Sequence, residues 1–460
     1  MALKIWSASA LLANGWADDV EITVDPCGDI SKVSSGVPWR DGERVGVMVP
    51  GVQNVHSHAH QRAMAGRGEQ TGRSSDGAED SFWTWRKAMY HYLERVQPGH
   101  LHHIATQLYL EMLKSGYTCV GEFQYLHHDV DGKAYENRAE MSLQCMQAAS
   151  RVGLGFTALP VLYRYGGFGG ADPLPAQKRF LNDVDDFVRI VETLQNESKH
   201  DANTSVGIAP HSLRAVNQEL LQQVIDHCGV DNLAAIHIHI AEQSREVDDC
   251  LAWSRQRPVE WLFNHFEVNQ KWCLIHATQM TNEETQRMAQ SGCVAGLCPT
   301  TEANLGDGLF NATDYLGAGG HWAIGSDSHI SIDPVEELRW LEYGQRLITH
   351  KRNLLASMAR ANTGRNLLDG ALRGGAQACG RNTGSIEEGY RADVVVLDEQ
   401  HPRLYGRNRD ELLDSWIFSG NENLVKDIYV GGQKVIDNGH HADEDKIAEN
   451  YRRTLDQLSD

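Results

Sequence analysis

Residues 234–242 read Ala-Ala-Ile-His-Ile-His-Ile-Ala-Glu, a short apolar and β-branched run that ends in polar residues. Such a run, with polar segments on both sides, is typical of a buried strand in a parallel sheet. Amphipathic stretches of helical length alternate with runs of this kind along the chain. The other runs lie at 51–58, 118–126, 153–164, 204–213, 272–279, 293–302 and 321–329. The pattern therefore predicts an α/β fold, a TIM-type (β/α)8 barrel over residues 50–384.

Outside the barrel, residues 1–49 and 385–440 contain short strand patterns separated by turns. We expect these two distant segments to pair into one small β-sandwich domain. The last twenty residues, 441–460, are rich in acidic and basic side chains and predict an exposed helical tail. About 40 residues follow the first barrel strand before helical spacing resumes, which is long for a βα loop and indicates a lid or substrate loop. It contains Gln61, Arg62, Arg67, Trp83, Trp85 and Arg86.

The composition is that of an ordinary globular protein, with 41% hydrophobic and 23% charged residues among 460. Its 62 acidic and 42 basic residues give a net charge of -20, which disfavours nucleic acid and anionic lipid as partners. There is no stretch of apolar residues long enough to cross a membrane. The nine cysteines are scattered and include no Cys-x-x-Cys pair. We therefore expect reduced thiols and a cytoplasmic protein.

Histidines and carboxylates gather at the ends of the predicted strands. His56 and His58 end the first strand, where residues two apart share a face and can converge on one ion. The fifth strand ends with His239 and Glu242, while His237 lies deeper and is expected to contact neighbouring groups instead. His276 ends the sixth strand and Asp327 the eighth. Because all strand ends of a parallel barrel meet at one face, these residues predict a metal site, and imidazole with carboxylate suits zinc, with iron or manganese left open.

The motifs that carry these residues resemble those of the amidohydrolase superfamily, in particular its deaminases. The resemblance extends over essentially the whole chain. More narrowly, the set resembles the formimidoylglutamate deiminases of histidine degradation. The segments concerned are VHSHAHQRAMAG (55–66), GEFQYLHHD (121–129), GIAPHSLRAV (207–216), HIHIAEQ (237–243), LIHATQ (274–279), LCPTTEANLGDG (297–308) and GSDSH (325–329).

The resemblance implies a zinc ion held by His56, His58, His239 and Asp327, with Glu242, His276 and Asp327 as catalytic residues. The binuclear members of the superfamily use a lysine on strand four, which this chain lacks, so we expect one metal ion. The implied reaction is hydrolysis of N-formimino-L-glutamate to N-formyl-L-glutamate and ammonia, in a homodimer. The substrate contacts carried over by position are Gln61, Arg86, Tyr125, His211 and Arg214.

The predicted site residues suit a small substrate with two carboxylates. The guanidinium groups of Arg86 and Arg214 match carboxylates, and they must supply recognition locally because the net charge repels a dianion. We expect Asp327 to take a proton from an activated water, His276 to stabilise developing charge and Glu242 to transfer protons. Two alternatives stay open: an aminohydrolase of a purine, pterin or triazine ring, and a non-catalytic barrel that serves as a binding scaffold.

Overall fold

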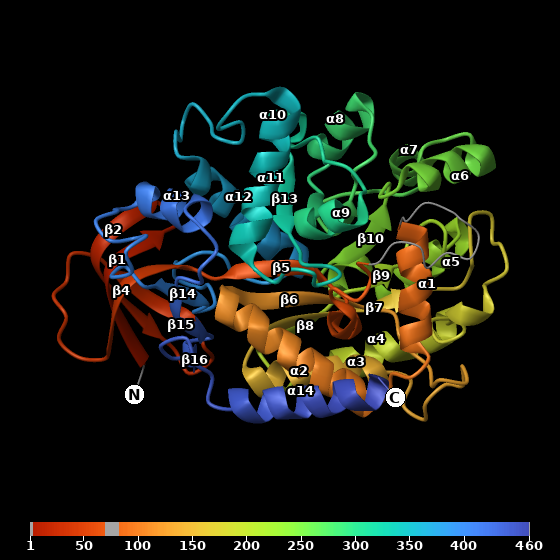
Figure 1. Ribbon diagram of the computed structural model, residues 1–460, viewed down its shortest axis with the longest axis horizontal. Helices are drawn as coiled ribbons and strands as arrows, with labels where there is room; N and C mark the ends of the chain where they lie inside the picture. The colour runs from red at the N-terminus through yellow and green to blue at the C-terminus, as the bar shows by residue number, and fades with distance from the viewer. Residues whose placement is uncertain (1–2, 70–81, 460) are drawn as a thin grey trace.

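The computed structural model describes residues 3–69 and 82–459 (Figure 1). The barrel consists of eight short parallel strands in chain order, the fourth of which is divided into β8 and β9. Almost all of their residues are buried. The strands are β5 (Val52–Ser57), β6 (Tyr117–Gln124), β7 (Gly155–Leu162), β8 (Thr204–Val206) with β9 (Ala209–Pro210), β10 (Ile236–Ile240), β11 (Trp272–His276), β12 (Val294–Leu297) and β13 (His321–Ile324). All eight predicted strands are therefore present.

Hydrogen bonds divide these strands into two ladders, β5-β6-β7-β8 and β10-β11-β12-β13, with β9 paired to β7. Isolated parallel bridges connect the ladders at both seams, Ser57 with Asp327 and Ile208 with Ile236. The structure thus has the predicted (β/α)8 barrel. Parallel strands buried on both faces explain why the sequence shows continuous apolar runs rather than alternation.

Helices surround the barrel as expected for βα units. The main ones are α2 (Pro98–Ser115), α3 (Glu140–Val152), α4 (Val184–Ser198), α5 (Gln218–Cys228), α6 (Ser244–Ser254), α7 (Pro258–His265), α8 (Asn282–Gln290), α10 (Ala312–Gly317), α11 (Pro334–Thr349) and α12 (Thr363–Cys379). Helix α12 packs against β13 and β5 and so covers the seam between the first and last strands.

Two segments near the site differ from the expectation. The seventh predicted strand extends to residue 302, but β12 ends at Leu297 and Pro299–Leu305 form helix α9, which begins where a proline favours the first helical turn. The predicted lid loop contains a short 3-10 helix, Ala59–Met64, and helix α1 (Phe82–Leu93). Trp83, Trp85 and Arg86 therefore lie on a helix. Residues 70–81 of that loop are outside the described part of the chain.

The strands from the two ends of the chain form one seven-stranded sheet in the order β16-β15-β14-β4-β1-β2-β3. They are β1 (Leu3–Leu12), β2 (Gly15–Val24), β3 (Ile30–Ser34), β4 (Glu43–Pro50), β14 (Val394–Leu397), β15 (Val425–Val430) and β16 (Gln433–Ile436). These strands thus form one continuous sheet in place of the expected sandwich, and the sheet is curved so that its two ends approach each other. A Cβ on Gly432, between β15 and β16, would lie 2.7 Å from Val24 of β2. The sequence did not predict α13 (Asp410–Phe418), which packs on α12. The domain division at residues 49 and 385 stays our proposal.

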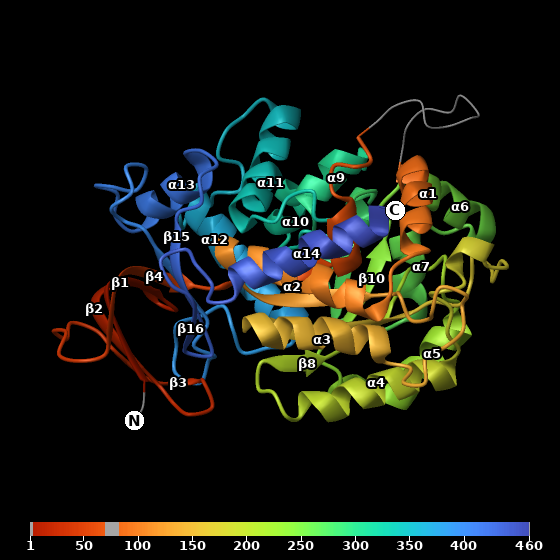
Figure 2. The ribbon, with the colours of Figure 1, turned by 60° about the horizontal axis from the view of Figure 1, so that its bottom comes forward.

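The C-terminal tail is helix α14 (Glu444–Ser459), which lies along α2 (Figure 2). It was expected to be an exposed helix, but it is docked. Ile447 and Leu458 are buried, and Lys114 of α2 pairs with Glu444 at 2.8 Å. Its apolar residues at positions 447, 451, 455 and 458 follow a helical period, so the segment buries one face and leaves its charged residues outside. Among the described helices, none has the length and apolar character that a membrane span requires.

Candidate active site

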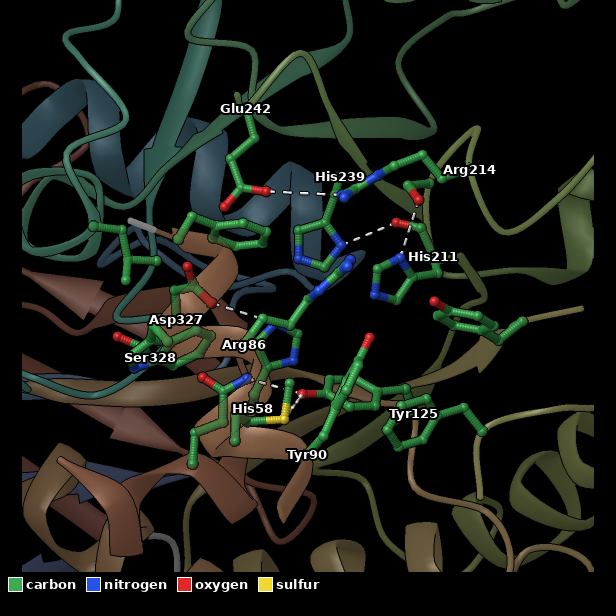
Figure 3. Close-up of a pocket in the computed structure, with 18 of the residues that line it drawn as sticks. His58, Arg86, Tyr90, Tyr125, His211, Arg214, His239, Glu242, Asp327 and Ser328 are labelled. Carbon is green, nitrogen blue, oxygen red and sulfur yellow. Dashed lines mark hydrogen bonds and ion pairs between the residues drawn. The ribbon is translucent and has the colours of Figure 1, made fainter. Parts of the chain in front are cut away.

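All but one of the residues predicted from the strand ends line one cavity at the carboxyl face of the barrel, and the exception, His56, is buried beside them (Figure 3). Several residues at these strand ends adopt a left-handed backbone conformation that non-glycine residues rarely occupy. The φ angles are +50° at Ala241, +70° at His276, +45° at Asp327 and +61° at His329. Such backbone strain commonly accompanies functional sites, because it turns side chains at strand ends toward a common point.

Four of the predicted side chains form a compact ligand set. Ligand atoms of His56, His58, His239 and Asp327 all lie within 4.8 Å of one another, and all four residues are buried. The Nε2 atoms of His56 and His239 are 3.0 Å apart. Asp327 Oδ1 lies 3.3 Å from His58 Nε2 and 3.6 Å from His56 Nε2.

The hydrogen bonds of these histidines test whether a metal ion fits. His58 Nδ1 donates to the carbonyl of Phe123 at 2.9 Å, and His239 Nδ1 donates to the carbonyl of His211 at 2.9 Å. Each Nε2 is therefore left with a lone pair that faces the cluster. Burial lowers the pKa of His58 to about 3 and that of His239 well below its ordinary value, so both rings are neutral, as metal ligands must be. The donor set fits zinc.

Glu242 and His276 lie on the other side of Asp327. His276 Nε2 is 3.7 Å from both Glu242 Oε1 and Asp327 Oδ2. Burial alone would lower the pKa of His276, but the carboxylates of Glu242, Glu302 and Asp327 outweigh burial and raise it to about 10. Burial raises the pKa of Asp327 to about 7. The site thus combines a cationic imidazole with a carboxyl group that can exchange protons near neutral pH.

The five side chains predicted to contact the substrate, Gln61, Arg86, Tyr125, His211 and Arg214, all line the same cavity. Gln61 donates to the Tyr125 hydroxyl at 2.9 Å. Arg214 is almost completely buried, and its Nη2 lies 4.0 Å from Glu242 Oε2. Arg86 reaches the cavity from α1, and burial together with the nearby Arg214 lowers its pKa. The two guanidinium groups therefore share one wall of the cavity, while their roles stay a prediction.

Two buried carboxylates that support the site were not identified from the sequence. Glu122 of β6 accepts hydrogen bonds from Ser57 Oγ at 2.5 Å and from the Ala59 amide at 2.7 Å, which fixes the chain on both sides of His58. Glu302 of α9 lies 3.2 Å from His276 Nδ1 and orients that ring. Both residues lie within the motifs 121–129 and 297–308, but no local pattern indicated where their side chains point.

Aromatic side chains also line the cavity. Tyr90 from α1, Tyr163 from the end of β7 and Phe180 join Tyr125, Phe82 and Trp85 around the opening. No role was expected for Tyr90, Tyr163 and Phe180. Tyr90 lies on α1, whereas Tyr163 and Phe180 lie in the connection between β7 and α4, and no local pattern in the sequence indicates that these rings meet.

A family model described as the amidohydrolase family matches residues 47–435. The match spans most of the chain, and the fold and the buried His and Asp cluster agree with it. The chain therefore belongs to the amidohydrolase family and is a hydrolase.

Individual proteins similar to this chain give a more specific comparison than the family model. The formimidoylglutamate deiminase of Pseudomonas aeruginosa is 47% identical over 457 residues, which is 99% of each chain. The 5'-deoxyadenosine deaminase of Methanopyrus kandleri is 25% identical over the whole of both chains. Among solved structures, an amidohydrolase from Brucella melitensis is 45% identical and superposes with a TM-score of 0.94 over 100% of both chains. A zinc-bound adenosine deaminase from Xanthomonas campestris, 21% identical, shares the fold with a TM-score of 0.80 over 99% of this chain and 98% of its own.

Proposed function

We propose that the protein hydrolyses N-formimino-L-glutamate to N-formyl-L-glutamate and ammonia, a step in histidine degradation. One observation carries the proposal: two arginines, Arg86 and Arg214, line the cavity that also contains the catalytic candidates Glu242, His276 and Asp327. A linear amidine with two carboxylates needs such a combination. The 47% identity to a formimidoylglutamate deiminase supports this choice of substrate.

One zinc ion is the proposed cofactor, held by His56, His58, His239 and Asp327. When bound, zinc supplies a water molecule of lowered pKa. Iron and manganese stay alternatives, because imidazole and carboxylate ligands accept them as well. A zinc-bound relative with the same fold favours zinc.

Three side chains, Asp327, His276 and Glu242, have different roles in the reaction. Asp327, whose Oδ2 lies 3.7 Å from His276 Nε2, would accept a proton from the attacking water. The His276 imidazolium stabilises negative charge as the oxygen adds to the formimino carbon. Glu242 delivers protons to the terminal nitrogen, so that the bond between this nitrogen and the carbon breaks and ammonia leaves. The nitrogen bonded to glutamate keeps its bond to the formyl carbon, and the product is N-formyl-L-glutamate.

The substrate is oriented by the remaining cavity residues. Arg214 and Arg86 pair with carboxylates, and Tyr125, His211 and Gln61 provide directional hydrogen bonds.

We propose a homodimer in the cytoplasm without nucleic acid or membrane partners. All nine cysteines are free thiols, which supports a reducing compartment. Sedimentation equilibrium would test the oligomeric state.

A ring aminohydrolase is the second candidate, and the aromatic lining of the cavity favours it. Tyr90, Tyr163 and Phe180 offer faces on which a base could stack. The experiment that separates the two compares ammonia release from formiminoglutamate with that from 5'-deoxyadenosine and a triazine, using the zinc-loaded protein. We expect turnover of formiminoglutamate and at most trace release from the rings. Preferred turnover of a ring would overturn the proposal, and no turnover of any substrate would favour the non-catalytic scaffold.

A further inference from the structure

Glu246 of α6 is a buried carboxylate directly behind the cavity wall. It is 0% exposed and is not among the residues that line the cavity. Its Oε1 accepts a hydrogen bond from the Ala241 amide at 3.1 Å, and its Oε2 accepts one from the Glu242 amide at 3.2 Å. The two oxygens of this side chain therefore bind two consecutive backbone amides.

These two hydrogen bonds hold a strained bend. Ala241 follows the last residue of β10 and has a φ of +50°, a left-handed conformation that is unfavourable for a non-glycine residue. The bend turns Glu242 into the cavity, where its Oε1 lies 3.7 Å from His276 Nε2. A buried amide without an acceptor is costly, so the Glu246 carboxylate stabilises the conformation in which Glu242 faces the site.

We propose that Glu246 is a positioning residue for Glu242. Its two hydrogen bonds fix the backbone from which Glu242 enters the cavity, and so hold that carboxylate in place for proton transfer. The inference rests on the proposed function for the role of Glu242. A residue that only stabilised the fold would not change kcat while product affinity and zinc content stay unchanged.

The test uses Glu246→Gln, which leaves one acceptor oxygen for the two amides, and Glu246→Asp, whose shorter side chain cannot reach both amides. Asp248→Asn is the matched control, since Asp248 is an exposed acid on the same helix. For each zinc-loaded protein, kcat on formiminoglutamate is measured together with the Kd of N-formylglutamate by calorimetry. Zinc content and circular dichroism verify the metal and the fold.

We expect Glu246→Gln to lower kcat at least about tenfold because Glu242 loses its support. It should bind N-formylglutamate with a Kd within about twofold of the wild type, because no residue that lines the cavity has changed. Glu246→Asp should likewise lower kcat with the Kd unchanged, and Asp248→Asn should change neither. If Glu246→Gln keeps kcat within about threefold, or loses zinc or product affinity together with kcat, the inference is wrong. If the wild-type protein itself does not turn over formiminoglutamate, the proposed function fails instead.

Discussion

At the scale of single residues, the two histidines of strand β10 are predicted to differ in function: one binds the metal ion and the other does not. His239 has a free Nε2 in the cluster, whereas His237 Nε2 donates to the carbonyl of Ala378 at 2.8 Å. We expect His239→Ala to lose bound zinc and activity, because a site with three remaining ligands holds the ion weakly. His237→Ala should keep about one zinc per folded chain. Metal analysis of the two purified variants checks this, and full zinc in His239→Ala would remove strand β10 from the metal site.

Arg214 is the residue on which substrate preference should depend. Removing one partner of a buried charged pair costs about 2–5 kcal/mol. We therefore expect Arg214→Met to reduce kcat/KM for formiminoglutamate by about thirtyfold to several-thousandfold while zinc content is unchanged. Arg164→Met, an exposed arginine just after β7, is the control and should have wild-type kinetics.

A second substrate makes this prediction specific. The wild-type preference for formiminoglutamate over a formimino amine that lacks carboxylates should largely disappear in Arg214→Met. A variant that keeps the full preference would show that Arg214 does not bind a carboxylate, and the ring aminohydrolase would then be the better hypothesis.

Glu122 gives a pH-dependent prediction. Burial raises its pKa from 4.5 to about 7 despite three hydrogen bonds, so the folded protein holds a proton that the unfolded chain has released. The stability from this group is complete below pH 4.5 and falls as the pH rises through 7, by about 3 kcal/mol at most. Melting temperatures of the wild type and Glu122→Gln between pH 4.5 and 8 test this. The wild type should lose stability relative to the variant across that range, and parallel curves would contradict the assignment.

At the scale of elements, α12 depends on close approach to the barrel. A Cβ on Gly374 would lie 2.0 Å from the carbonyl oxygen of Trp322 in β13, and a backbone atom cannot move away easily. We expect Gly374→Ala to destabilise the protein by about 1–3 kcal/mol or more. Gly99 lies in the first turn of α2 with nothing within 4 Å of its added Cβ. Gly99→Ala should therefore gain about 0.4–1 kcal/mol, as denaturant unfolding of both variants would show. Equal stabilities would refute the packing argument.

The elements also show what could be predicted from the sequence. The eight strands and their terminal histidines follow from apolar runs and from the rule that parallel strand ends meet at one face. Helix α1 was missed because its aromatic residues 82, 83, 85 and 90 and the methionine at 89 lie on several sides and leave no clear polar face. Glu302 was missed because the strand predicted at 293–302 includes it, and a strand directs its side chain differently from helix α9.

At the scale of the whole molecule, the pairing of distant segments was only partly predictable. Two ends with strand patterns indicated a common β domain, but no local pattern encodes the contact between β4 and β14, 344 residues apart at Pro50 and Val394. The docking of α14 on α2 likewise depends on partners far away in sequence. The metal cluster could be predicted more completely from the sequence, because the barrel topology itself brings its four ligands together.

The central claim is that the whole molecule hydrolyses a formimino group and releases its terminal nitrogen. The most direct measurement is product identification by NMR after the zinc-loaded protein has consumed formiminoglutamate, with ammonia measured in the same samples. We expect N-formylglutamate and ammonia in a 1:1 ratio, and no turnover after zinc is removed with a chelator until zinc is restored. Formamide and glutamate as the main products, or unchanged turnover in the metal-free protein, would contradict the account.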